Sequence, residues 1–289
     1  MVYEGNIYRP PSEAHSLIVQ ATIGCAHNSC AFCSMYKDKQ FRARPTDEVI
    51  ADLREARSLY SRINRVFLAD GDALVLPADS LLALCTEIRA LFPECERASL
   101  YGTPQDALRK TPEELRALAE AGLGIVYIGA ESGDDTVLSR INKGVTAKEI
   151  IQAIQKIENA GIAASVTFIS GLGGPERSEE HAAGCARVIS EAEPAYASLL
   201  TLLLEPGAPM YEELRRGNFE FMTPEQIAGE TLLLLDRARP RKDCVFRSNH
   251  ASNYVSLRGT LPHDNDRLIE TLKTALAKGA FKNDHFRLL

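Results

Sequence analysis

The sequence predicts an α/β fold with a largely parallel sheet, and three observations predict it. Short apolar runs rich in β-branched residues alternate with longer segments of helical periodicity. Several helical segments begin at capping residues. With 289 residues, 45% of them apolar, one core is large enough and a second domain is not required. Alternation implies parallel pairing through right-handed crossovers, which allows a doubly wound sheet, a partial barrel or a full eight-fold barrel.

Six apolar runs are the predicted strands. They are Leu17–Ile23, Arg65–Ala69, Ala98–Tyr101, Gly124–Ala130, Ala163–Ile169 and Ala195–Leu204. In barrels and open α/β sheets the chemistry is built at the carboxyl ends of the strands. We therefore searched the loops that follow these runs for functional residues.

Helical spacing and caps predict the helices between the strands. The helical segments follow Thr46, span Leu81–Leu91, follow Thr111, lie between Thr146 and Gly161, follow Thr223, and include Leu268–Leu276. Thr111 and Thr146 each begin a capping box, with glutamate three residues later. The alternation ends near Pro240, so we expect residues 241–289 to be a C-terminal extension of a core that spans residues 1–240.

Charge and targeting signals narrow the class of protein. The net charge is −6, which argues against a general nucleic-acid footprint, and no apolar window is long enough to span a membrane. Met1–Pro11 lacks the basic start and apolar core of a signal peptide, and seven cysteines fit a reducing cytosol. We therefore expect a cytoplasmic protein with neither a membrane nor a nucleic acid as partner. A local basic strip is either a solvated face or a positive rim for an anionic substrate; it comprises Lys37, Lys39, Arg42 and Arg44.

Three cysteines lie within nine residues directly after the first predicted strand. Cys25, Cys30 and Cys33 have the spacing C-x4-C-x2-C. Thiolates hold iron–sulfur clusters and zinc, and an iron–sulfur cube on three cysteines leaves one iron open. A zinc site would need a fourth ligand such as His27, and Cys30 with Cys33 could also form a redox pair. Three buried apolar cysteines are the remaining alternative, and the tight spacing favours the cluster.

The cysteine loop resembles that of the radical S-adenosylmethionine (SAM) superfamily. The usual spacing there is C-x3-C-x2-C with an aromatic residue before the last cysteine, and Phe32 occupies that position. The first gap is one residue longer here. The resemblance implies a partial (β/α)6 TIM-like barrel, a [4Fe-4S] cluster on the three cysteines, and SAM bound to the open iron. It covers residues 17–205.

The second predicted strand leads into Asp70-Gly71-Asp72. Glycine permits close approach of a ligand and a carboxylate can accept from an ammonium group, although an ordinary turn favours the same residues. The position is similar to the family's Gly-Gly-Glu-Pro motif, whose backbone binds the SAM amino group. Asp72 stands where glutamate is usual, and Gly71 and Asp72 are the implied contacts.

The fourth predicted strand ends in Gly129-Ala130-Glu131-Ser132-Gly133, and Lys143-Gly144 follows. This resembles the G-x-E-S-G run of a superfamily branch that includes coproporphyrinogen oxidase-like and methylthiotransferase-like enzymes. The resemblance implies that Glu131 lies at the SAM amino or ribose groups, that Ser132 is a further cofactor-binding residue, and that Lys143 lies near the SAM carboxylate. A carboxylate and an ammonium together suit a zwitterionic ligand. The alternative is a surface ion pair at a helix start.

The fifth predicted strand leads into a glycine-rich turn, Ser170-Gly171-Leu172-Gly173-Gly174. Glycines allow a ligand to approach closely, although the run alone is a weak signal. It resembles the family's I-x-G motif along adenine, which implies that Gly171 lies at the base and that Thr167 points toward the ribose.

The resemblance implies an enzyme that takes one electron from a donor such as flavodoxin or ferredoxin. That electron cleaves SAM to a 5′-deoxyadenosyl radical, which abstracts hydrogen from a small-molecule substrate. Two alternatives come from other classes: a zinc-stabilised binding protein, and a heme- or cluster-handling protein on a radical SAM scaffold.

A polar run near the C-terminus is the candidate substrate side. It contains Arg247, Asn249, His250, Asn253 and Tyr254, and its pattern predicts a loop or an irregular strand. Arginine offers a planar donor fork for a carboxylate, and histidine can act as an acid or base. We expect this segment to cover the open side of the partial barrel. A polar surface turn or a helix cap is the alternative.

Overall fold

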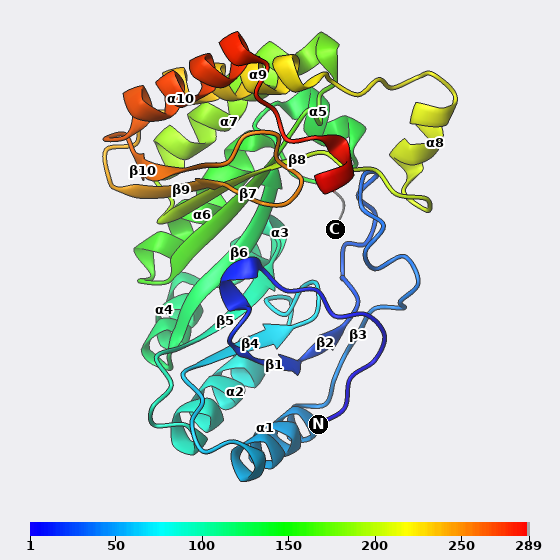
Figure 1. Cartoon of the computed structure of the whole chain (residues 1–289). Helices are drawn as coiled ribbons and strands as arrows, with labels where there is room; N and C mark the ends of the chain where they lie inside the picture. Colours follow the sequence, from blue (N-terminus) through cyan, green and yellow to red (C-terminus); the bar gives the residue numbers. More distant parts are fainter. Residues whose placement is uncertain (288–289) are drawn as a thin grey trace. The chain divides into compact units, whose positions relative to one another are not determined.

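The computed structural model describes residues 1–287, and it divides into two compact units. Unit 1 comprises Met1–Asn28, Met35–Ile128 and Lys156–Ala164. Unit 2 comprises Ser29–Ser34, Gly129–Gln155 and the chain from Ser165 onward. Figure 1 labels the elements of both, and each unit is described by itself.

The strands of unit 1 are parallel apart from one short antiparallel pair. β1 (Leu17–Gln20), β4 (Arg65–Ala69), β5 (Arg97–Gly102) and the first part of β6 (Leu123–Glu131) follow one another in that order. Leu17 lies opposite Val66, and Arg65 lies opposite Arg97. β2 (Thr22–Ile23) pairs with β3 (Arg42–Ala43) in antiparallel fashion.

Besides the end of one further helix from Lys156 onward, unit 1 also contains four complete helices and a 3-10 turn. They are η1 (Pro11–Glu13), α1 (Thr46–Leu59), α2 (Ala78–Leu91), α3 (Pro104–Arg109) and α4 (Pro112–Glu120). α1 and α2 lie side by side beneath β1 and β4 in Figure 1, and they bury Leu53 and Leu81 on their inner faces. The predicted capping box at Thr111 is confirmed: its hydroxyl accepts from the Glu114 amide, and Glu114 accepts from the Thr111 amide.

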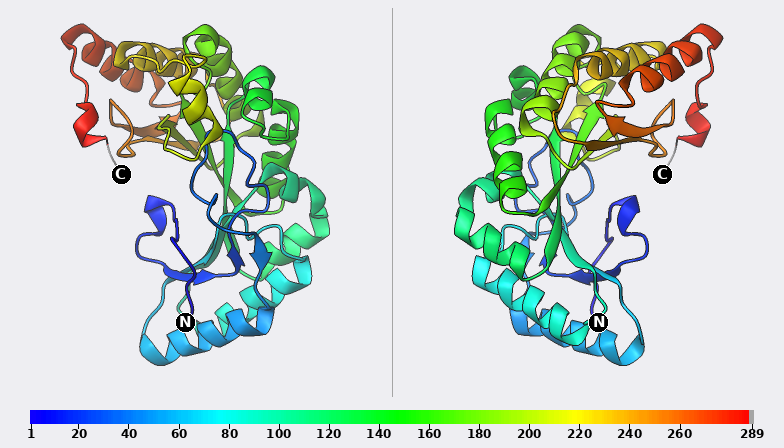
Figure 2. Two further views of the ribbon diagram at one scale, coloured as in Figure 1. Left: turned by 90° about the vertical axis from the view of Figure 1, so that its right-hand side faces the viewer. Right: turned by 90° about the vertical axis from the view of Figure 1, so that its left-hand side faces the viewer.

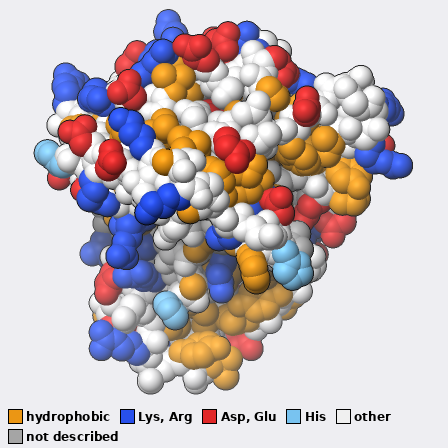
Figure 3. Space-filling model, turned by 45° about the horizontal axis from the view of Figure 1, so that its top comes forward, with side chains coloured by type: hydrophobic (Ala, Val, Ile, Leu, Met, Phe, Trp, Pro, Cys, Tyr) orange, Lys and Arg blue, Asp and Glu red, His pale blue; other side chains and the backbone are white. Residues whose placement is uncertain are grey.

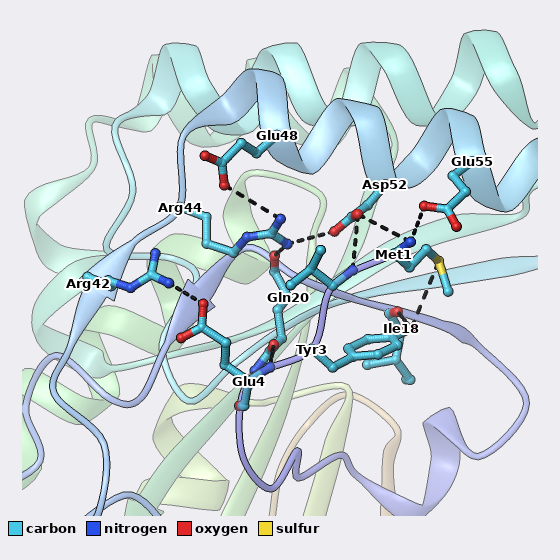
Figure 4. Close-up of polar contacts among 11 residues, drawn as sticks. Met1, Tyr3, Glu4, Ile18, Gln20, Arg42, Arg44, Glu48, Asp52 and Glu55 are labelled. Atoms are coloured by element: carbon cyan, nitrogen blue, oxygen red, sulfur yellow. Dashed lines mark hydrogen bonds and ion pairs between the residues drawn. The ribbon is translucent and has the colours of Figure 1, made fainter.

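The first segment of the chain is fastened to β1 and α1 (Figure 4). The Val2 amide donates to Asp52 of α1 at 3.2 Å, and the Tyr3 hydroxyl donates to the Ile18 carbonyl at 2.7 Å. Arg44 joins the same group of residues, because it donates to Asp52 at 2.7 Å and to the Gln20 carbonyl at 2.8 Å. The entry into β1 is therefore held by both main-chain and ionic contacts.

Unit 2 contains β7 (Ala163–Ser170, from Ser165), β8 (Tyr196–Thr201), β9 (Cys244–Ser248) and β10 (Leu257–Leu261). β7, β8 and β9 are parallel, and β10 runs antiparallel to β9. The remaining elements are α5 (Asp135–Arg140), α6 (Ala147–Asn159, to Gln155), η2 (Pro175–Arg177), α7 (Ser178–Ala192), α8 (Pro209–Arg215), α9 (Pro224–Arg237), α10 (Asn265–Lys278) and η3 (Asp284–Phe286). α7, α9 and α10 pack next to one another as a layer on these strands (Figures 1 and 2).

The predicted α/β class is confirmed: the strands are mostly parallel, and the described residues show no closed barrel. The first predicted strand is interrupted at Ala21, because β2 leaves β4 and pairs with β3. Residues 244–248, where we predicted a loop or an irregular strand, form the regular strand β9, which pairs with Tyr196–Ser198 of β8. The assignment of residues 1–240 to a core and 241–289 to an extension stays a prediction. Among the described residues, no helix combines the length and apolarity that crossing a membrane requires.

Candidate functional site

The three clustered cysteines differ from the core cysteines in exposure. Cys25, Cys30 and Cys33 are each partly exposed, and none of the seven cysteines forms a disulfide. Cys85 and Cys185 are buried; burial raises the pKa of Cys85 to about 12 and that of Cys185 well above the usual value. Because thiolates are the metal ligands, the clustered thiols fit a metal-binding role and the core thiols do not.

In unit 1, Cys25 lies against a backbone turn that only glycine fits. The Gly71 amide donates to the Gly24 carbonyl at 3.1 Å. A Cβ added at Gly71 would lie 2.5 Å from the Tyr36 ring and 3.0 Å from Cβ of Cys25. Tyr36 and Cys25 therefore lie close against Gly71, and the neighbouring Asp72 is buried. Contact of Gly71 with a ligand stays a prediction.

Asp70 bonds to Gly24 and to Lys39, which lie before and after the three cysteines in the sequence. Its Oδ2 accepts from the Gly24 amide at 3.2 Å and from Lys39 Nζ at 2.6 Å. Both side chains are almost fully buried, at 0% exposed for Asp70 and 5% for Lys39. Sequence reasoning did not single out Asp70, although an acidic residue at the end of a buried strand was the available signal.

The basic strip has carboxylate partners within unit 1. Lys39 pairs with Asp70, Arg44 pairs with Asp52, and Arg42 pairs with Glu4 (Figure 4 shows the last two pairs). Lys39 and Arg44 are buried side chains, so neither fits a solvated face. Lys37 is exposed and donates to the Asn28 carbonyl at 2.6 Å.

In unit 2, the segment with Cys30 and Cys33 is tied to two other loops. The Ala31 amide donates to the Ile141 carbonyl at 2.8 Å, and the Ala31 carbonyl accepts from the Met210 amide at 2.9 Å. Asn142 Nδ2 also donates to the Ser29 carbonyl at 3.3 Å. Phe32 and both cysteines are partly exposed on this fixed segment.

Glu131 and Lys143 form a nearly buried ion pair in unit 2. Lys143 Nζ lies 3.1 Å from Glu131 Oε1, and the two side chains are 7% and 11% exposed. Glu131 ends β6 with a positive φ of 65°, and a Cβ at Gly129 would overlap its carboxylate. The alternative of a surface pair is therefore wrong, since surface pairs are solvated and this one is not.

Gly133 and Ser132, the last two residues of the G-x-E-S-G run, contact helix α7. A Cβ at Gly133 would overlap the backbone of Gly184 in α7, so glycine permits the helix to approach. Ser132 Oγ lies 2.8 Å from Nδ1 of His181, also in α7, and it accepts from the Asp134 amide at 3.1 Å. The run therefore fixes the end of β6 against α7.

The end of β7 is held by a carboxylate that sequence reasoning missed. Glu230 of α9 accepts from Ser170 Oγ at 2.6 Å and from the Gly171 amide at 2.8 Å. Gly171 has φ 80°, a conformation that favours glycine, and Thr167 is partly exposed on the same strand. The available signal was a charged residue among the apolar positions of the helix that follows Thr223.

The C-terminal candidates divide into exposed and structural residues. Arg247 and Asn249 are exposed, and Arg247 donates to the carbonyls of Phe246 and Gly259. Asn253 is buried and donates to the Leu199 carbonyl at 2.8 Å. His250 Nδ1 lies 2.9 Å from Ser252 Oγ; burial, and secondarily Lys282, lower the pKa of this histidine.

Tyr254 is covered by the C-terminal segment. The Arg287 guanidinium lies 3.6 Å from the centre of the Tyr254 ring, and the tyrosine hydroxyl donates to Asp284 at 3.0 Å. Arg287 also donates to the Ser252 carbonyl at 2.6 Å. Asn253 and Tyr254 thus have structural partners, and the substrate-side role of the segment stays a prediction.

An α/β sheet with three partly exposed cysteines after its first strands is the kind of scaffold on which enzymes build a site. Within the described residues, no three His, Cys, Asp or Glu side chains are gathered where they could hold a metal ion. A model of the radical SAM superfamily matches residues 19–186, more than half of the chain, and the chain belongs to this superfamily. The cofactors of this superfamily are a [4Fe-4S] cluster and SAM.

Two relatives align with about two thirds of the chain. An uncharacterized methyltransferase of Pyrococcus horikoshii is 25% identical over 197 residues, which cover 68% of this chain and 41% of the relative. A tRNA-2-methylthio-N(6)-dimethylallyladenosine synthase of Thermobifida fusca is 26% identical over 204 residues, which cover 66% and 39%. The chain thus spans about two fifths of the length of these relatives.

A solved structure shares the fold. The radical SAM methyltransferase TsrM of Kitasatospora setae, solved with cobalamin and a [4Fe-4S] cluster, superposes with a TM-score of 0.58 at 18% identity. The match covers 70% of this chain and 39% of TsrM. This match confirms the predicted partial barrel fold and gives no information about the substrate.

Proposed function

We propose that the chain is a radical SAM enzyme that abstracts hydrogen from a small-molecule substrate, with Cys25, Cys30 and Cys33 as cluster ligands. The observation that carries the proposal lies in unit 2. There the backbone of Ala31, between Cys30 and Cys33, is bonded to Ile141, two residues before Lys143. Lys143 in turn pairs with Glu131. A backbone hydrogen bond, two residues of chain and an ion pair therefore connect the proposed cluster loop with the nearly buried pair of Glu131 and Lys143.

The Glu131–Lys143 pair suits the amino-acid end of SAM. A buried carboxylate can accept from an ammonium group, and a buried ammonium can donate to a carboxylate. Their mutual pairing offsets the cost of burying either group alone. We assign Glu131 and Ser132 to the amino or ribose groups and Lys143 to the carboxylate.

The other cofactor contacts follow the same chemistry. Gly71 and Asp72 follow the end of β4, Gly171 directly follows β7, and Thr167 lies within β7. Phe32 is the aromatic neighbour of the last cysteine. When bound, the cluster and SAM supply one-electron cleavage of SAM and hydrogen abstraction. The protein's residues bind and orient the two groups and restrict the access of water.

A small molecule is the proposed substrate class, with a low-potential protein such as flavodoxin or ferredoxin as electron donor. Figure 3 shows Lys and Arg side chains interspersed with Asp and Glu in its upper part, over α9 and α10. Arg237 pairs with Glu179 and Arg267 pairs with Asp264 there. This face lacks the uniform positive field that attracts a nucleic-acid backbone. No disulfide joins any of the seven cysteines, all of which lie within the described residues, and this fits our proposal of a cytoplasmic location.

Two reconstituted samples test the proposal. The protein is reconstituted anaerobically with iron and sulfide, reduced with dithionite and given SAM together with deuterated cell extract. One sample receives the small-molecule fraction and the other receives the tRNA fraction. We expect deuterium in 5′-deoxyadenosine with the small-molecule fraction. Label from the tRNA fraction alone would overturn the proposed substrate class, and binding of SAM without any 5′-deoxyadenosine would favour a heme- or cluster-handling protein.

A further inference from the structure

A chain of buried polar side chains crosses unit 2 between the ends of two strands. It begins at Ser132, directly after β6, and ends at Ser170 and Gly171, at the end of β7. His181 of α7 and Glu230 of α9 lie between them, and they are 1% and 4% exposed. Helix interiors place few such groups among apolar residues without a function for them, because burying a polar group has a cost.

Glu230 is the centre of this chain. Its Oε1 accepts from Ser170 Oγ at 2.6 Å and from the Gly171 amide at 2.8 Å, while its Oε2 accepts from Ser178 Oγ at 2.9 Å. Three donors thus converge on one carboxylate from a strand end and a helix start. Hydrogen bonds to an ionised acceptor are the strong ones, so this carboxylate fixes the turn after β7.

His181 extends the contacts to the end of β6. Its Nε2 lies 3.9 Å from Glu230 Oε1, and its Nδ1 lies 2.8 Å from Ser132 Oγ. Ser132 Oγ already accepts from the Asp134 amide, so its proton can be donated to Nδ1. That arrangement leaves the ring proton on Nε2, which lies 3.7 Å from Cys185 Sγ as well as 3.9 Å from the Glu230 carboxylate.

We infer that Glu230 and His181 are positioning residues, which hold the ends of β6 and β7 in the arrangement that binds SAM. The inference rests on the proposed function, because Glu131, Ser132 and Gly171 are its proposed SAM contacts. Neither residue is assigned a contact with SAM itself. Their effect passes through the Gly171 turn and through Ser132, as outer residues commonly orient the groups that touch a ligand.

Three substitutions separate positioning from general stability. Glu230→Leu removes every acceptor, whereas Glu230→Gln retains a carbonyl oxygen that can accept from Ser170 and Gly171. Thr231→Val is the matched control, since Thr231 is also buried on α9 and its hydroxyl donates only within the helix, to the Ile227 carbonyl. If Glu230→Leu does not fold, Ser170→Ala with Ser178→Ala removes two of the three donors instead.

Two measurements are made on each variant. The first is hydrogen–deuterium exchange of residues 168–174 and 130–134 in the protein without cofactors. The second is the SAM dissociation constant of the reconstituted protein, with iron and sulfide measured in parallel. We expect Glu230→Leu to speed exchange in both segments. It should also weaken SAM binding about ten- to hundredfold at unchanged iron content, which is the usual effect of substituting a residue that orients ligand-binding groups. Glu230→Gln should recover most of this loss.

Two results would overturn the inference. One is an unchanged SAM dissociation constant in Glu230→Leu. The other is an equal loss in Thr231→Val, which would indicate general destabilisation of α9. If the unsubstituted protein itself failed to bind SAM, the proposed function would fail, while the exchange measurement would still report whether Glu230 holds the two strand ends.

Discussion

Lys143 Nζ lies 3.1 Å from Glu131 Oε1, and both side chains are nearly buried in unit 2. The pair depends on backbone features of both partners. Glu131 has a positive φ and Gly129 leaves room for its carboxylate, while Lys143 follows Asn142, whose φ is 54°. A non-glycine residue in this conformation is uncommon and points to function.

Removal of either charge should weaken SAM binding. The loss of one charge-assisted contact corresponds to about 1.5–3 kcal/mol, or about ten- to hundredfold in affinity. We therefore expect Glu131→Ala and Lys143→Ala to raise the SAM dissociation constant by that factor, measured calorimetrically on reconstituted protein. Arg140→Ala, which breaks the more exposed pair with Glu176, is the control and should leave it unchanged. Unaltered affinity in both test variants would contradict the assignment.

The glycine before this pair gives an independent test. A Cβ at position 129 would overlap the Glu131 carboxylate, so Gly129→Ala should displace it from Lys143. We expect weaker SAM binding, comparable to that of Glu131→Ala, with the charges themselves retained. Gly229→Ala, where an added Cβ meets nothing within 4 Å, is the matched control on α9. Equal SAM affinity in the two glycine variants would show that the carboxylate position does not matter.

The buried Asp70–Lys39 pair should contribute to the stability of unit 1. Lys39→Met would leave the carboxylate of Asp70 buried without its cation. Breaking a buried pair in this way typically costs about 3–5 kcal/mol. We expect a loss in that range for the free energy of unfolding in urea, whereas Arg54→Met, at the exposed pair with Glu87, should cost at most about 1 kcal/mol. Similar losses for the two variants would argue that Lys39 is not held as described.

His250 should make the protein less stable in mild acid. Burial and Lys282 lower its pKa in the folded state below the usual value near 6.5. The unfolded chain therefore takes up the proton first, and stability falls as the pH drops from about 6.5 toward the folded pKa. His250→Gln should remove this part of the pH dependence, as measured by urea unfolding at pH 7.5 and at pH 5.5. A stability loss between these pH values that is as large in the variant as in the parent protein would contradict the prediction.

Local sequence signals predicted much of the fold and part of the site. The six strands follow from apolar runs, and the helix starts at Thr111 and Thr223 follow from capping chemistry that acts within four residues. Glu131 and Lys143 were expected near one ligand, because both residues belong to one recognisable run, but their pairing with each other in a nearly buried position was not predicted. Each of these features depends on residues that lie close together in the sequence.

The residues that were missed depend on long-range contacts. Glu230 and His181 are polar residues on the buried faces of helices that carry other charged residues outside, and only the fold shows that they lie between β6 and β7. Asp70 meets Lys39 across 31 positions of sequence. β9 was predicted as a loop or irregular strand because its polar residues obscure the period, while pairing with β8 determines its conformation.

The cluster assignment is tested by iron and sulfide content. Cys30→Ala should fail to assemble a cluster, because two thiolates hold a cube poorly. Cys85→Ala is the control, since Cys85 is a buried core thiol whose pKa is raised to about 12. Full iron and sulfide in Cys30→Ala would remove Cys30 from the ligand set, and stoichiometric zinc in place of iron and sulfide in the parent protein would favour the zinc-stabilised alternative.

Formation of 5′-deoxyadenosine from SAM tests the central claim most directly. The reconstituted protein is reduced with dithionite under strict anaerobic conditions, and 5′-deoxyadenosine is quantified beside the Cys30→Ala and Cys85→Ala variants. We predict 5′-deoxyadenosine from the parent protein and from Cys85→Ala, and none above background from Cys30→Ala. A fully reconstituted and reduced parent protein that yields no 5′-deoxyadenosine, or equal yields from all three proteins, would contradict the claim that this chain cleaves SAM with a cluster on its cysteine loop.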